Sequence, residues 1–255
     1  MRRMTKRDEA ILRVANRLGY VSRDQIQRYL FKCSLHPYWC SCSNRGKTAV
    51  NRRLRQLVYA GELQSISIPK SYGIFEGDIY VPAKNGGAEV TLEEIGVCKH
   101  GLLINDILLW LAMSQTETIK LEKIAQEEFR RIADSAFKLI IRSSKVSPRC
   151  FLEADRGTES GPQLQAKFER YREGWIQESG LILFVTTRNT LFTPAQSAAR
   201  AGLAKHVLIC NFEENRSSNA FFEAAWSTPL LAGITLMDYL FPSEPVDESD
   251  SIFEF

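Results

Sequence analysis

The stretch Cys150–Thr158, with the sequence CFLEADRGT, constrains the fold of this chain more than any other. Its apolar and small residues lead into two carboxylates, Glu153 and Asp155, and a turn follows at once. On a strand, residues i and i+2 point to the same face, so these carboxylates are expected to project together from the C-terminal end of a strand. A mostly parallel sheet places its chemistry at that end. Such a pair can bind Mg²⁺ or Mn²⁺, although acidic pairs in solvated turns are also common.

The segments around this stretch predict an α/β fold. Residues 136–141 and 149–154 are typical of strands, and the turn-like SSKVSP between them predicts a hairpin. Residues 119–132 fit either a strand or a helix. The remaining expected elements are a helix over about 92–113, a helix from 163 to about 177, a buried strand at 181–187, a helix at 193–204 and a buried strand at 206–210. The order of strands and helices indicates an α/β arrangement with a mixed sheet.

The charge of the chain is distributed unevenly. Residues 1–60 contain 14 Lys and Arg against 3 Asp and Glu, whereas the remaining residues contain 19 against 27. A basic N-terminal block ahead of an acidic body indicates a nucleic-acid-binding module joined to a second domain. The alternative is a basic surface that is simply solvated.

The helical periodicity of this block predicts a winged helix-turn-helix domain over 1–82. Helices are expected at 5–18, after the capping box that begins at Ser22, and at about 47–60, followed by a hairpin of strands 63–68 and 78–81. In a winged helix the third helix enters the major groove of double-stranded DNA, although winged helices also mediate protein contacts. The polar face of that helix supplies the candidate DNA-binding residues Lys47, Asn51, Arg52, Arg53 and Arg55.

An insertion between the second and third helices contains Cys33, His36, Cys40 and Cys42. These side chains could hold a structural Zn²⁺, although their spacing differs from standard zinc fingers. The alternative is a loop with reduced thiols. Six cysteines without a signal peptide indicate a reducing cytoplasm, and no apolar run reaches the roughly 18 residues of a membrane span.

The domain organisation follows from composition. The turn-rich segment 83–91 is expected to link the N-terminal domain to a second domain over 92–242. Residues 243–255 contain five acids and no base, which is typical of an acidic tail.

Further polar residues could complete a site around the two carboxylates. Asp134 stands just before the strand 136–141, and Glu128 precedes it. Lys167 and Tyr171 lie four residues apart on the expected helix and therefore share a face. Carboxylates with a nearby lysine can bind a divalent cation, activate water and stabilise charge on a phosphate. The alternative for Lys167 and Tyr171 is an ordinary helix surface or a partial core.

Over residues 5–210 the chain resembles the replication-relaxation family, which includes the MobC-type plasmid mobilisation relaxases related to restriction endonucleases. The resemblance rests on the expected winged helix, the segment HGLLIND at 100–106, the acidic pair Glu127 and Glu128, the sequence FLEADRGTE, the segment KFERY at 167–171 and the run LILFVTT. The order of elements is also similar to the αβββαβ core of PD-(D/E)xK nucleases.

The resemblance implies DNA nicking at a plasmid transfer origin, or DNA relaxation tied to replication, with an accessory mobilisation protein as a further partner. It implies that Asp134, Glu153 and Asp155 bind Mg²⁺ or Mn²⁺, with Glu128 as a fourth acid. Two positions depart from the nuclease pattern, because Ala133 replaces the usual proline and Asp155 replaces the usual lysine. Lys167 is therefore expected to supply the positive charge.

The nucleophile of such a reaction is either metal-activated water or Tyr171. We favour water, because the only histidines are His36, His100 and His206, and tyrosine relaxases commonly use a site of three histidines. Two other classes of function fit the sequence. One is a non-catalytic DNA-binding regulator of replication or transfer, and the other is an accessory mobilisation protein whose C-terminal domain docks a partner.

Overall fold

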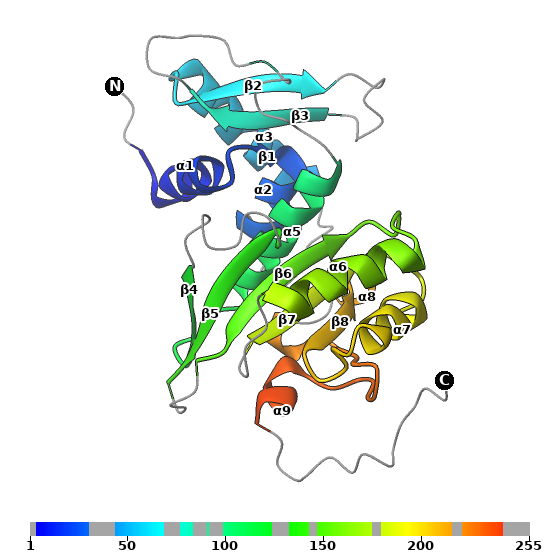
Figure 1. Cartoon of the computed structure of the whole chain (residues 1–255). Coiled ribbons are helices and arrows are strands. Elements are labelled where there is room, and N and C mark those ends of the chain that lie inside the picture. The colour runs from blue at the N-terminus through cyan, green and yellow to red at the C-terminus, as the bar shows by residue number, and fades with distance from the viewer. Residues whose placement is uncertain are drawn as a thin grey trace. The chain divides into compact units, whose positions relative to one another are not determined.

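A computed structural model describes residues 4–30, 44–68, 77–83, 91, 99–123, 133–142, 147–174, 180–215 and 221–241 (Figure 1). The chain divides into two compact units, Met1–Leu109 and Trp110–Phe255. The division falls inside helix α5 (Lys99–Met113), so this helix contributes residues to both units. The segment 83–91, which we expected to be a linker, lies almost wholly outside the described residues.

The first unit begins with three helices, α1 (Lys6–Leu18), α2 (Arg23–Leu30) and α3 (Asn44–Tyr59). Thr5 and Asp8 form a capping box at the start of α1, and Gly19 ends that helix with a φ of +79°. A second capping box joins Ser22 and Gln25 at the start of α2. The structure thus confirms the three helices that the periodicity predicted.

A small antiparallel sheet accompanies these helices. It contains β1 (Val21–Ser22), β2 (Leu63–Ile68) and β3 (Gly77–Pro82) in the order β1-β3-β2. The hairpin of β2 and β3 is confirmed, whereas β1 was not predicted because two residues are too few to show an alternating pattern. The core of this unit is made of buried aliphatic side chains from helices and strands, including Ile11, Ile26, Val50, Leu54, Leu57, Ile79 and Val81.

The second unit is built on a five-stranded mixed sheet in the order β4-β5-β6-β7-β8. The strands are β4 (Ile119–Lys123), β5 (Ser135–Ile141), β6 (Arg149–Asp155), β7 (Gly180–Thr186) and β8 (Val207–Asn211). The first three strands pair antiparallel, and the last three pair parallel. Every residue of β7 and β8 is buried, which explains why these strands are continuous apolar runs rather than alternating ones.

Two helices pack against each other on one face of this sheet (Figure 1). They are α6 (Gly161–Gly174) and α7 (Phe192–Arg200). Phe168 and Tyr171 of α6 join Phe151, Ile182 and Phe184 of the strands in one buried cluster. The arrangement confirms the predicted mixed α/β architecture, including the 136–154 hairpin and the strand-helix-strand order that follows it.

The last part of the chain adds an aromatic cluster that the sequence did not predict. The elements are α8 (Phe212–Asn215), a 3-10 turn at Phe221–Glu223 and α9 (Leu236–Leu240). The ring of Phe221 lies edge-on to Trp110 and Trp226, with centroid distances of 5.0 and 5.2 Å. The expected acidic tail at 243–255 lies outside the described residues. Among the helices that are described, none is long and apolar enough to cross a membrane.

Candidate active site at the ends of the parallel strands

The three parallel strands of the second unit all end in a polar residue. Asp155 ends β6, Thr186 ends β7 and Asn211 ends β8. The register places Asp155 beside Thr186 and Thr186 beside Asn211. All three side chains are buried. The sheet therefore presents a row of buried polar groups at the edge where parallel sheets place ligands.

Glu153 lies two residues before Asp155, on the face of the sheet that α6 covers. Its side chain is 3% exposed. One carboxylate oxygen accepts a hydrogen bond of 2.5 Å from the hydroxyl of Tyr171, and the other accepts one of 3.1 Å from Nζ of Lys167. Lys167 and Tyr171 are adjacent on one face of α6, as their spacing predicted. The structure therefore brings three of the predicted site residues into direct contact.

The surroundings of Glu153 change its acidity. The pKa of Glu153 rises from 4.5 to about 7, and burial of the carboxylate is the main cause. The charge of Lys167 and the hydrogen bonds from Tyr171 and Lys167 oppose this rise, whereas the charge of Asp134 adds to it. Burial also raises the pKa of Tyr171 well above its ordinary value, and the charge of Glu153 adds to that rise. Glu153 is thus the acid of this site that can exchange a proton near neutral pH.

Tyr171 is completely buried, with an exposed fraction of 0%. Its hydroxyl donates to Glu153, and its ring packs edge-on against Phe151 with centroids 5.8 Å apart. A nucleophile must reach the phosphate it attacks, and its hydroxyl must lose a proton. In this conformation Tyr171 holds Glu153 in place. Its use as a nucleophile, the alternative to metal-activated water, stays a prediction.

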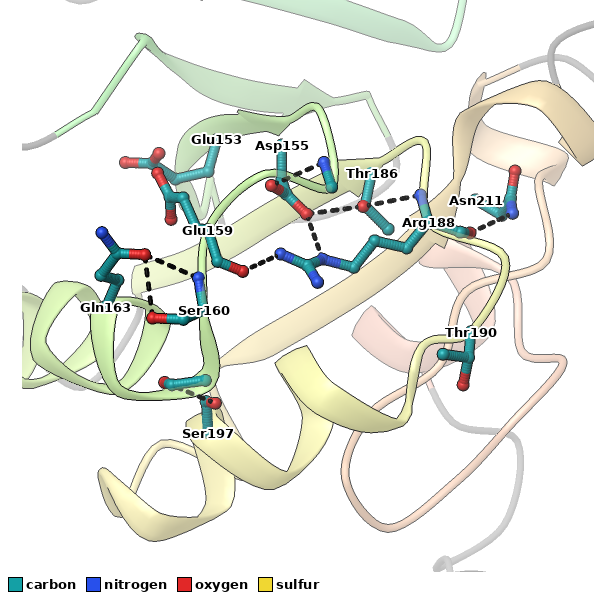
Figure 2. Close-up of polar contacts among 12 residues, drawn as sticks. Glu153, Asp155, Glu159, Ser160, Gln163, Thr186, Arg188, Thr190, Ser197 and Asn211 are labelled. Carbon is teal, nitrogen blue, oxygen red and sulfur yellow. Dashed lines mark hydrogen bonds and ion pairs between the residues drawn. The ribbon is translucent and has the colours of Figure 1, made fainter.

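Asp155 has partners different from those of Glu153, although both project from the same face of β6 (Figure 2). Its Oδ2 accepts hydrogen bonds of 2.7 Å from Thr186 Oγ1 and 2.6 Å from Arg188 Nε. Its Oδ1 accepts one of 2.9 Å from the amide of Gly157. The carboxylate is 2% exposed, so the Arg188 charge offsets the cost of burying it.

Arg188 is the centre of this network, and the sequence did not identify it. Its amide donates to Thr186 Oγ1 at 3.1 Å, and its carbonyl accepts from Asn211 Nδ2 at 2.7 Å. Its Nη2 donates to the carbonyl of Glu159 (Figure 2). Arg188 thereby ties the ends of all three parallel strands to the turn after β6. A sequence signal existed, since each buried strand ends in a polar residue and Arg188 follows the second of them by two positions.

The β5–β6 hairpin places Asp134 beside the C-terminal end of β6. Ser135 pairs with Leu152, so the residue before Ser135 lies beside the end of β6. Asp134 Oδ2 accepts a hydrogen bond of 2.8 Å from the amide of Ala154, the residue between Glu153 and Asp155. Its own amide donates to the carbonyl of Leu152 at 3.1 Å. The sequence could not show this convergence, which depends on the register of the hairpin.

Glu159 is a further acid of the site that sequence reasoning passed over. Its Oε1 lies 2.8 Å from Nζ of Lys167, so Lys167 stands between Glu159 and Glu153. Its Oε2 is buried and has no hydrogen-bond partner. Glu159 ends the FLEADRGTE motif, so it could have been found by extending the acidic pattern past the turn.

The oxygens of these acids are the ligand type that a hard cation such as Mg²⁺ prefers. Within the described part of the chain, however, no three acidic, histidine or cysteine side chains are grouped so that they could hold a metal ion. Lys167 and Tyr171 engage Glu153, and Arg188 and Thr186 engage Asp155. A cation would compete with these donors. Glu128 and the expected zinc ligands Cys33, His36, Cys40 and Cys42 lie outside the described residues.

The candidate DNA-binding residues of the first unit are distributed over two faces of α3. Arg52 and Arg55 are exposed, and Asn51 is half-buried. Arg53 turns toward α1, where its Nε lies 3.5 Å from the Asp8 carboxylate and its Nη2 donates to Thr5 Oγ1. Arg53 therefore joins α3 to α1, and its role as a DNA contact stays a prediction. The side chain of Lys47 lies outside the described residues.

Comparison of the chain with protein-family models, with curated proteins and with solved structures finds no match.

Proposed function

We propose that the protein is a DNA-nicking enzyme of the relaxase type, dependent on Mg²⁺ or Mn²⁺ and acting at a plasmid transfer or replication origin. The observation that carries this proposal is the hydrogen bond from the Ala154 amide to Asp134, which holds Asp134 against the Glu153–Asp155 segment. An acid at the start of one strand beside an acid at the end of the next resembles the arrangement of a PD-(D/E)xK nuclease, with Asp155 in place of the usual lysine.

The order of elements from α5 onward supports the same proposal. Helix α5 is followed by the antiparallel strands β4, β5 and β6, then by α6 and by β7, which is parallel to β6. This is the αβββαβ order of that nuclease class. The three helices and the antiparallel hairpin of the first unit support a winged-helix domain in the same way, with Arg52 and Arg55 available to double-stranded DNA.

Each residue of the site would have a distinct role in nicking. Asp134, Glu153 and Asp155 are the residues that would hold a cation, in competition with the donors that now engage Glu153 and Asp155. A bound cation would supply charge neutralisation and lower the pKa of water. Lys167 lies at Glu153 and would offset negative charge on the phosphate. Tyr171 fixes the Glu153 carboxylate through its hydroxyl. Arg188 fixes Asp155 and the turn that carries Glu159.

A plasmid nicking assay tests this function. Supercoiled plasmid carrying the DNA that flanks the protein's own gene is incubated with the full chain and Mg²⁺ or Mn²⁺. We expect conversion to the open circle, its loss with EDTA, and a reduction of about 100-fold or more in Glu153→Gln, since such groups typically contribute that much to a rate. Glu173→Gln, a change of the same kind at an exposed position of α6, is the control and should nick normally. Undiminished nicking by Glu153→Gln would contradict the proposal.

A second function is favoured by a specific observation. Both oxygens of Asp155 are engaged by Arg188, Thr186 and Gly157, as expected of a residue that stabilises the fold. This suits a non-catalytic DNA-binding regulator of replication or transfer, whose second unit has retained the fold without the reaction. The same assay separates the two functions, because a regulator binds the plasmid but leaves it supercoiled with either cation.

A further inference from the structure

One face of α3 is fully exposed and ends in an aromatic residue. Thr48, Arg52, Arg55 and Tyr59 are spaced at i, i+4, i+7 and i+11, which places them along one side of the helix. All four side chains are exposed, whereas Val50, Leu54 and Leu57 on the opposite side are buried. We call these four exposed residues the α3 stripe.

Tyr59 is the unusual member of the α3 stripe. Its side chain is 96% exposed, against 46% for Phe192 and 41% for Phe241, the next most exposed aromatic side chains in the described part of the chain. It makes no hydrogen bond there, although a tyrosine hydroxyl can both donate and accept. Its ring and hydroxyl therefore contribute nothing evident to folding and are available to a partner.

The charge of the α3 stripe indicates the chemistry of that partner. Arg52 and Arg55 add two exposed positive charges on the same side of the helix, and the stripe holds no acid. Arg and Tyr side chains both donate hydrogen bonds to phosphate oxygens. The phosphate backbone of DNA fits this surface, since both of its charges are positive and its exposed tyrosine adds a neutral donor.

The length of α3 indicates where Tyr59 would lie on DNA. The helix has 16 residues and is therefore about 24 Å long, whereas the major groove is about 12 Å wide. A helix inserted in the groove by its first turns must leave the groove at its C-terminal end and pass the phosphate backbone there. Tyr59 is the last residue of α3, one turn beyond Arg55.

We propose that Tyr59 is a DNA contact of the first unit and that its hydroxyl donates a hydrogen bond to a backbone phosphate of double-stranded DNA. This inference rests on the proposed DNA-binding role of α3. It adds a contact that fixes the position of the helix on the duplex and does not read sequence. The bond is formed by an uncharged group, so it strengthens binding without releasing a counterion.

The test measures binding of the full chain to a mixed-sequence duplex of about three helical turns by fluorescence anisotropy over a series of salt concentrations. Because the contact is to a phosphate, the specific DNA site is not needed. We expect Tyr59→Phe to weaken binding about fivefold to tenfold, the equivalent of one hydrogen bond. The slope of log K against log salt should stay unchanged, whereas Arg55→Ala should reduce that slope by about 1.

Tyr239→Phe is the control, because it removes the same hydroxyl from the second unit, where that hydroxyl donates to the Lys205 carbonyl. It should bind the duplex like the wild type. If Arg52→Ala and Arg55→Ala both leave binding unchanged, the proposed role of α3 fails and this inference fails with it. If the arginine variants weaken binding but Tyr59→Phe does not, only the inference is overturned. A loss seen in Tyr59→Ala alone would also overturn it, since the ring and not the hydroxyl would then make the contact.

Discussion

Glu153 and Asp155 stand two residues apart on one face of β6 and yet have different partners. Asp155 is paired with the guanidinium of Arg188, whose Nε lies 2.6 Å from the carboxylate. Glu153 is buried next to Asp134, and its pKa rises to about 7 in spite of Lys167. The sequence predicted that the two side chains share a face. It also placed Lys167 and Tyr171 in the site, but it did not identify Arg188, which lies 33 residues from Asp155 along the chain.

The raised pKa of Glu153 predicts a specific pH dependence of stability. Between about pH 4.5 and 7 the unfolded chain has released the proton of this group, whereas the folded chain still holds it. The folded state then binds more protons, so its stability falls as the pH rises through this window. Glu153→Gln removes the titration. The free energy of unfolding of the wild type, measured relative to Glu153→Gln by urea titration, should fall by roughly 3 kcal/mol at most between these values and then level off.

Below pH 4.5 the free energies of unfolding of the wild type and Glu153→Gln should differ by a constant amount. Both the folded and the unfolded wild type are then protonated at Glu153. Glu173→Gln, an exposed glutamate on α6, is the matched control and should follow the wild type throughout. A wild type that gained stability relative to Glu153→Gln from pH 4.5 to 7 would show that the folded state prefers the carboxylate, contrary to this account.

Asp155 and Arg188 form a buried ion pair, so the effect of changing either residue on stability should depend strongly on whether the other is present. Arg188→Met leaves a buried carboxylate without its cation and should lower the free energy of unfolding by about 3 kcal/mol. Adding Asp155→Asn to this variant removes the unpaired charge. The double variant should therefore be less destabilised than the sum of the two single changes, by at least about 1 kcal/mol in urea unfolding.

Arg172→Met provides the comparison for that cycle, because Arg172 is exposed and its carboxylate partner Glu173 lies 3.9 Å away. Its loss should change stability by about 0.5 kcal/mol or less. Strict additivity of the Asp155 and Arg188 changes would mean that the two groups do not stabilise each other.

At the scale of elements, the sequence predicted best where a pattern is long and local. The continuous apolar runs of β7 and β8 and the hairpin of β5 and β6 are all present. The sequence failed where a contact is brief or distant. The two residues of β1 pair with β3 through a register of two positions, and Trp226 pairs with Ile234 through a single bridge. Neither gives a periodic signal, since each depends on the tertiary fold.

The turn after β6 connects the surroundings of Glu153 with those of Asp155, because its Glu159 contacts both Lys167 and Arg188. Gly157 determines the backbone conformation of this turn. Its φ is +74°, and a Cβ there would lie 3.3 Å from Cγ of Arg188. Gly157→Ala should therefore cost about 1 kcal/mol for the left-handed backbone and roughly 1 kcal/mol more for displacing Arg188. The matched control is Gly233→Ala, which has a φ of +72° and no atom within 4 Å of the added carbon.

The difference between these two variants in urea unfolding isolates the contact with Arg188. Equal losses of stability in Gly157→Ala and Gly233→Ala would show that Arg188 can move aside at no cost. The turn would then play no part in fixing Arg188. The experiment thus separates the conformational requirement for glycine from the packing requirement.

At the scale of the whole molecule, the uneven charge led us to expect two functional parts, and the structure divides the chain into two compact units. The linker that we expected at 83–91 lies almost wholly outside the described residues, and the division into compact units lies further along the chain. It falls between Leu109 and Trp110, inside the apolar run Ile107–Met113 that ends this helix. Within the first unit Asn105 bonds the Tyr20 carbonyl, and within the second Trp110 packs on Phe221. A single helix thus supplies core residues to both units, and composition alone does not mark that change.

Two separate cores predict that damage to one unit is confined to it. Leu54 and Leu183 are completely buried, one in each unit, and either change to alanine should cost about 2–5 kcal/mol. Hydrogen exchange of the full chain should show faster exchange in α3 and β2 for Leu54→Ala, with β6 and β7 still protected. Leu183→Ala should give the reverse. The first variant should also lose affinity for duplex DNA while the second keeps it, because the exposed arginines belong to α3. Faster exchange throughout the chain in either variant would mean that the two units unfold as one, through the helix they share.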